Sequence, residues 1–85
     1  MKKQIKTYIT RGIQEKGLDK DIPHLLERFF EKEWGDVSKE DAKYNNLALA
    51  TEDRILASYN VRGTKVWIIM DAGHEIVTVL LPDEY

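Results

Sequence analysis

Residues 54–81 read RILASYNVRGTKVWIIMDAGHEIVTVLL, and this stretch decides the fold. It holds three runs rich in β-branched and aromatic residues, at 54–61, 65–70 and 75–81. Arg62-Gly63 is a two-residue loop of the type that favours a primed β-turn, and residues 71–74 turn the chain again. Pro82 ends the third run because proline cannot donate to a strand ladder. The stretch predicts a three-stranded antiparallel meander.

The Arg62-Gly63 loop also predicts a register, with Tyr59 opposite Val66 and Ala57 opposite Ile68. A tight turn at Ala72-Gly73 would then set Ile68 opposite Val77. These pairings give one apolar face, which we call the core face: Ile55, Ala57, Tyr59, Val66, Ile68, Met70, Val77, Val79 and Leu81. The second face comprises Leu56, Ser58, Trp67, Ile69, Ile76, Thr78 and Leu80.

The second face is more apolar than expected for a sheet surface that faces water. It is therefore expected either to be covered by the rest of the chain or to contact a partner. Five of its residues form a candidate interaction surface for a protein partner or for a homodimer: Leu56, Trp67, Ile69, Ile76 and Leu80.

Two helices are predicted before the meander. The first begins after Asp21, with Pro23 in its first turn, and its apolar residues recur at helical spacing from Ile22 to Phe30. It is expected to end near Trp34-Gly35 and to cover the core face. The second begins after the N-cap Ser38 and runs to about Ala50. Upstream, residues 4–10 favour a short strand, and residues 12–17 favour a helical turn.

Together these elements predict a single α+β domain over residues 1–85. It comprises a short N-terminal strand or arm within a basic segment (1–20), two helices (21–51) and the β-meander (54–81) packed against them. With 42% apolar and 33% charged residues the chain has the composition of a globular protein rather than a disordered one. No apolar run is long enough to span a bilayer and no signal-peptide pattern follows Met1, so a cytoplasmic location without membrane contact is expected.

The residues that could carry chemistry give no catalytic signature. The chain lacks cysteine, and His24 and His74 stand in no metal-ligand spacing, so no metal site is predicted. There is no glycine-rich phosphate loop, and no cofactor is predicted. Acidic and amide groups gather at the start of the second helix, where helix capping explains most of them. With two residues of the meander they form a candidate polar site: Asp36, Asp41, Asn45, Arg54 and Tyr59.

Charge is distributed unevenly along the chain. Residues 1–20 carry six Lys/Arg against two acidic residues, a balance of +4, and the remainder carries seven against thirteen, a balance of −6, which sums to the net −2. A basic N-terminus can contact phosphates, so weak nucleic-acid binding through Lys2, Lys3, Lys6 and Arg11 is one alternative function.

Several blocks of sequence together resemble a small family of proteins carried on plasmids, phages and integrative conjugative elements. They are Trp34-Gly35-Asp36, Glu40-Asp41-Ala42 with Asn45, the runs at 54–59 and 65–69, and Val79-Leu80-Leu81-Pro82-Asp83-Glu84-Tyr85. Members are labelled "plasmid-related protein" or "type I restriction subunit M". The resemblance covers residues 33–85 and implies no activity, because the members are uncharacterised. The restriction-subunit label does not fit this sequence, since 85 residues leave no room for a methyltransferase domain. Residues 70–74 depart from the family's pattern.

The first hypothesis from the sequence is therefore a non-enzymatic accessory protein of a mobile element that acts as a protein-interaction module. The alternative is a small-ligand or nucleotide-binding protein, such as a counter-defence factor, that uses the candidate polar site.

Overall fold

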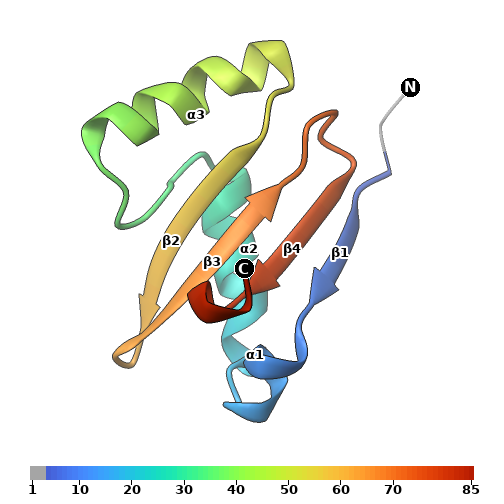
Figure 1. Cartoon of the computed structure of the whole chain (residues 1–85), viewed down its shortest axis with the longest axis vertical. Helices are drawn as coiled ribbons and strands as arrows, with labels where there is room; N and C mark the ends of the chain where they lie inside the picture. Colours follow the sequence, from blue (N-terminus) through green and yellow to red (C-terminus); the bar gives the residue numbers. More distant parts are fainter. Residues whose placement is uncertain (1–3) are drawn as a thin grey trace.

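The computed structural model of the chain describes residues 4–85, which fold into one four-stranded sheet with helices packed on and beside it (Figure 1). The strands are β1 (Lys6–Ile9), β2 (Ile55–Val61), β3 (Thr64–Met70) and β4 (Ile76–Leu80). The α-helices are α1 (Arg11–Glu15), α2 (Ile22–Phe30) and α3 (Lys39–Thr51), and 3-10 turns lie at η1 (Asp19–Asp21) and η2 (Pro82–Glu84). The predicted α+β class and the β-meander packed against two helices are confirmed.

The first hairpin has the predicted register. Tyr59 pairs with Val66, and Ala57 pairs with Ile68. Arg62 and Gly63 both adopt positive φ, at 50° and 85°, as a type I′ turn requires. The local turn chemistry therefore fixes this pairing.

The second hairpin corrects the predicted register by two residues. Ile68 pairs with Val79 instead of Val77, and Met70 takes Val77. The Asp71 amide donates to the Ile76 carbonyl (3.0 Å), so these two residues close the hairpin and the connecting loop holds four residues, 72–75. Within the loop, the His74 amide donates to the Asp71 carbonyl (2.9 Å). A shift of two residues leaves each side chain on its predicted face, since strand side chains alternate with a period of two.

The N-terminal strand adds a fourth member that the sequence did not place in the sheet. β1 lies parallel to β4, with Tyr8 opposite Thr78, and the strand order is β1-β4-β3-β2. Bonds from the Lys6 amide to the Glu75 carbonyl (2.9 Å) and from the Thr10 amide to the Val79 carbonyl (3.1 Å) frame this pairing. The predicted meander is thus three strands of a mixed sheet.

Helix α2 ends four residues before the predicted terminus. Lys32 takes the left-handed conformation (φ 68°), and the Glu33 amide bonds back to the Arg28 carbonyl at 3.0 Å, which closes a Schellman motif. Trp34 nevertheless locks this end to the core: its ring packs edge-on against Phe29, and its Nε1 donates to Asn46 of α3 at 3.0 Å. Helix α3 begins as predicted, since the Ser38 hydroxyl accepts from the Asp41 amide at 3.0 Å.

The core lies between the core face and α2, which runs behind the sheet in Figure 1. Ile22, Leu25 and Phe29 of α2 are buried there, as is Ile13 of α1. Each large apolar side chain buried in this way contributes about 1.5–3 kcal/mol relative to an exposed one.

The free edge of β2 is closed by the chain itself. Asn45 of α3 donates from Nδ2 to the Leu56 carbonyl (2.9 Å) and accepts from the Leu56 amide (3.4 Å). Two residues further along, the Ser58 amide donates to the Trp34 carbonyl (3.1 Å) and its carbonyl accepts from the Asp36 amide (2.6 Å). Gly35 permits this approach, because a Cβ there would overlap the Ser58 carbonyl oxygen. Over residues 4–85, no helix is long and apolar enough to cross a membrane.

Candidate interaction face

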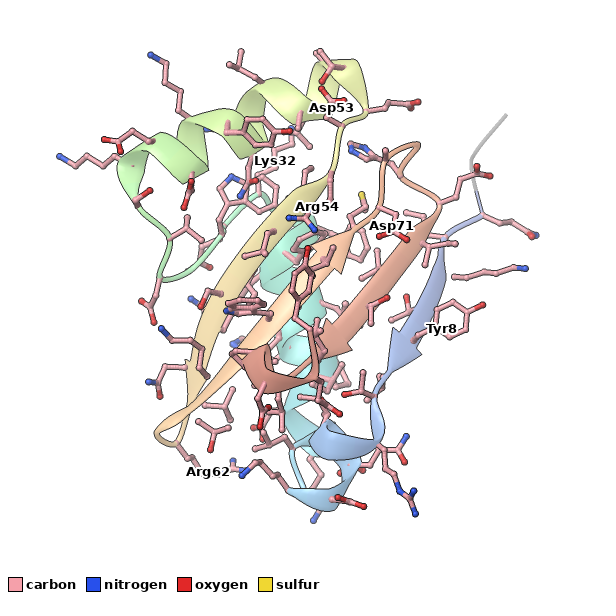
Figure 2. All side chains as sticks on the ribbon, viewed as in Figure 1. Tyr8, Lys32, Asp53, Arg54, Arg62 and Asp71 are labelled. Atoms are coloured by element: carbon pink, nitrogen blue, oxygen red, sulfur yellow. The ribbon has the colours of Figure 1, made fainter. Side chains whose placement is uncertain are left out.

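The register places the second face on the side of the sheet away from α2. Along one row, Leu56 of β2, Ile69 of β3, Thr78 of β4 and Tyr8 of β1 lie side by side. Arg54, which precedes β2, and Asp71, which follows β3, lie over this face, and Tyr8 lies at the edge far from α3 (Figure 2). The face therefore extends from α3 to β1.

The C-terminal segment crosses the second face and is held there by Glu84. The Glu84 carboxylate accepts from the Thr10 hydroxyl (2.6 Å), the Gly12 amide (2.9 Å) and the Leu81 amide (2.9 Å). The bond from Thr10, followed by those from the Leu81 and Gly12 amides, holds the pKa of Glu84 below its usual value. This carboxylate thus joins the C-terminal turn to the start of α1.

Tyr85 lies where this segment places it, over the middle of the second face. Its ring packs edge-on against Trp67 with the centroids 5.8 Å apart. The Arg54 guanidinium lies 5.5 Å from the same ring centroid and donates to the Tyr85 hydroxyl. Tyr85 nevertheless remains 68% exposed. The ring is therefore held by Trp67 and Arg54 and is still accessible to a partner.

Two hollows flank Arg54. The α3 hollow, about 410 Å³, is lined by Asp41, Tyr44, Asn45, Arg54 and Leu56. The C-terminal hollow, about 280 Å³, is lined by Arg54, Ile69, Asp71, Thr78, Leu80, Glu84 and Tyr85. Arg54 therefore forms the wall that both share.

The predicted interaction surface divides into accessible and covered residues. Leu56 and Trp67 are half-buried, and Ile76 is 38% exposed. Ile69 and Leu80 are only 5% exposed and form the floor of the C-terminal hollow. Tyr85 of the C-terminal segment packs against Trp67 and covers part of it.

The candidate polar site assembles in part. Asp41, Asn45 and Arg54 meet in the α3 hollow. Asp36 lies exposed beside β2, where its amide bonds to Ser58. Tyr59 lies on the core face, and its hydroxyl donates to the Glu33 carbonyl at 2.6 Å. Burial raises the pKa of Tyr59, so the phenol stays protonated. Its side chain does not line the α3 hollow.

Two of the four basic N-terminal residues, Lys6 and Arg11, lie within the described part of the chain. Lys2 and Lys3 lie outside the described residues. The backbone of Lys6 pairs with Ile76 in the sheet, and Arg11 forms an exposed ion pair with Glu15 at 3.2 Å.

Of the histidines, His24 is exposed, and His74 contacts the Asp53 carbonyl through Nε2 at 2.7 Å. No group of three His, Cys, Asp or Glu among residues 4–85 is arranged to hold a metal ion.

Sequence reasoning missed four exposed residues of this region: Tyr8, Tyr44, Leu47 and Tyr85. Tyr44 and Leu47 are one turn apart on α3, at a spacing that makes side chains neighbours on a helix surface. This i, i+3 spacing of two large apolar side chains on the predicted second helix was the available signal. Nothing local indicated Tyr85, because its position depends on contacts with residues 18 and 31 positions away.

Comparison with known proteins yields no match: no family model, no curated protein and no solved structure is significantly similar to this chain. Function is therefore inferred from the residues of the second face.

Proposed function

We propose that this chain is a non-enzymatic protein-interaction module that binds a partner protein through the second face. One observation carries the proposal: Tyr44, Arg54, Trp67 and Tyr85 gather around two adjoining hollows. Tyrosine, tryptophan and arginine are the residues most enriched at the energetic centres of protein interfaces. The resemblance to mobile-element proteins suggests a partner encoded by such an element or by its host.

The face is built to bind with little loss of conformational freedom. Tyr85 is held by Trp67 and Arg54, and its segment is held by Glu84. Ordering a flexible side chain on binding costs about 0.5–1.5 kcal/mol, so anchors that are already ordered spare part of this cost. The C-terminal hollow, with Ile69 and Leu80 at its floor, also offers a preformed place for an apolar side chain of a partner.

Charge indicates the chemistry of that partner. Asp41 borders the α3 hollow, and Asp71 and Glu84 border the C-terminal hollow, with Arg54 between them. Residues 21–85 carry seven basic against thirteen acidic residues, a balance of −6. We therefore expect a partner surface that presents an apolar side chain to the C-terminal hollow and basic groups to the acidic residues around both hollows.

The experiment is site-specific photo-crosslinking in the cells that carry the gene. A photoreactive residue replaces Tyr44, which is 53% exposed, or Glu27, which is exposed on α2 on the opposite side of the sheet. The proposal predicts one discrete protein adduct from position 44 and none from position 27. Equal adducts from both positions, or none from position 44, would refute it. An adduct with a second copy of this chain would show that the partner is this protein itself and that it forms a homodimer through the second face.

A second candidate function is small-ligand binding in the α3 hollow, which the polar lining of that hollow supports. Asp41, Asn45 and Arg54 line that hollow, and its volume of about 410 Å³ falls within the range of small-molecule sites. Nucleotides are the ligands to screen first, by thermal shift, with Asp41→Ala as the variant. Stabilisation of the wild type but not of this variant would favour the ligand; no shift with any nucleotide would reject it.

A further inference from the structure

The two edges of the sheet are treated differently by the fold. On β2, Asn45 and residues 34–36 occupy the outward backbone groups of Leu56 and Ser58. On β1, no described element lies along the outer side, and β1 is the edge strand in Figure 1. An exposed strand edge is a template for pairing with another chain, and residues 4–85 cover only one of the two edges of this sheet.

The backbone groups that β1 presents outward can be identified from its pairing. Lys6 and Thr10 donate to β4, and backbone groups alternate along a strand, so Lys6, Tyr8 and Thr10 face inward. Ile5, Thr7 and Ile9 therefore present their amides and carbonyls outward. Within residues 4–85, no hydrogen bond involves the backbone of Thr7 or Ile9 on that side.

We propose that the outer edge of β1 pairs with β1 of a second copy of this chain. The two strands would run antiparallel about a twofold axis at Thr7, and two four-stranded sheets would join into one of eight strands. The hydrogen bonds of this pairing come from the backbone of β1, so it does not depend on Tyr44, Arg54, Trp67 and Tyr85, which carry the proposed function.

The register follows from which groups face outward. With Thr7 opposite Thr7 of the second copy, Ile5 lies opposite Ile9 and Lys6 opposite Tyr8. The outward groups then form three hydrogen-bonded pairs of two bonds each, about six in all. A twofold axis at Tyr8 would align only the pairs between Thr7 and Ile9, about four bonds. The first register is therefore favoured.

Side chains in this register suit a second copy. On the core side, Ile5 of one chain meets Ile9 of the other beside the Thr7 pair, and these are favourable cross-strand combinations. On the other side, Lys6 meets Tyr8, which is 53% exposed. Lys6 is the one charged residue of β1, so no carboxylate is brought opposite another.

The short strand limits the strength of the dimer. Pairing of about five residues a side buries less surface than a standard stable interface, so we expect a weak, transient dimer. The dimer should then appear only as the protein concentration rises.

Sedimentation equilibrium on the full chain tests the pairing, with two variants at one position. Thr7→Pro removes an outward amide that the monomer does not use, and proline is tolerated on edge strands. Thr7→Ala is the matched control, because it keeps that amide. We expect wild type and Thr7→Ala to dimerise and Thr7→Pro to remain monomeric. A wild type that stays monomeric up to about 1 mM, the weak end of the affinity range of specific complexes, would overturn the proposal.

Amide hydrogen exchange provides a second test that needs no variant. The Thr7 and Ile9 amides should become more protected as concentration rises, whereas the Lys6 amide, bonded to Glu75, should not change. Protection that is independent of concentration at Thr7 and Ile9 would refute the edge pairing. A dimer that persists in Thr7→Pro but is lost in Tyr44→Ala would place the contact on the second face and would equally overturn it.

Discussion

Asn45→Ala is expected to destabilise the chain through one strand edge. The Asn45 side chain is 2% exposed and makes both of its hydrogen bonds to the backbone of Leu56. Alanine leaves the Leu56 carbonyl and amide without these partners. A buried polar group that loses its partner costs about 1–3 kcal/mol.

The magnitude follows from the two bonds. The bond to the carbonyl is short, at 2.9 Å, and that from the amide is long, at 3.4 Å, so most of the loss comes from the first. Alanine returns up to about 0.7 kcal/mol through its higher helix propensity. We therefore expect the free energy of unfolding to fall by about 1–2.5 kcal/mol, roughly 4–20 °C in Tm for a domain of this size.

Urea denaturation followed by circular dichroism measures this loss. Lys43→Ala on the exposed side of the same helix is the control, and it should change the free energy of unfolding by less than about 0.5 kcal/mol. The m-value should remain that of the wild type in both variants. If Asn45→Ala proves as stable as Lys43→Ala, the closure of the β2 edge by Asn45 contributes nothing to the free energy of unfolding.

Four further substitutions test other contacts. Gly35→Ala should lower the free energy of unfolding by about 2–5 kcal/mol, because it combines a left-handed conformation with overlap on the Ser58 carbonyl. Gly63→Ala, at similar φ in open space, should cost only about 1–2 kcal/mol, and equal losses by urea denaturation would contradict the close approach. Ser58→Ala should be neutral or stabilising by up to about 1 kcal/mol, since the buried hydroxyl has no partner within residues 4–85; a clear loss in the same assay would reveal a missed bond. Finally, the lowered pKa of Glu84 means that its ionised form stabilises the fold: this contribution is full above the unfolded pKa of about 4.3 and is lost as pH falls through the folded value. Unfolding measured across that range should be less pH-dependent in Glu84→Gln, and an unchanged pH dependence would count against the role of this carboxylate.

The meander could be predicted because its signals are local. Alternation of apolar residues and the Arg62-Gly63 turn specify the first hairpin, whose pairing the structure confirms. The second hairpin was misjudged by two residues, since 71–75 can turn through either a two-residue or a four-residue loop. Both loops keep the same faces, and for this reason the core face was right while the register was wrong.

The contacts that shape the candidate site are long-range, and no local pattern reports them. β1 pairs with β4 about 70 positions along the chain, and Glu84 bonds to Thr10 across 74 positions. Asp41, Asn45 and Arg54 were correctly grouped because the helix and the following strand are close in sequence. Tyr59 was misplaced in that group, although the alternation of its own strand assigns it to the core face.

Binding through the second face is the central claim, and calorimetric titration of the crosslinked partner tests it most directly. Tyr44→Ala removes an exposed ring that makes no hydrogen bond to the described residues, and Glu27→Ala changes an exposed residue on α2. We predict that Tyr44→Ala weakens binding about tenfold or more, the loss of about 1.4 kcal/mol expected of an interface anchor, and that Glu27→Ala has no effect. Equal affinity of the wild type and Tyr44→Ala, or a loss confined to Glu27→Ala, would contradict the claim.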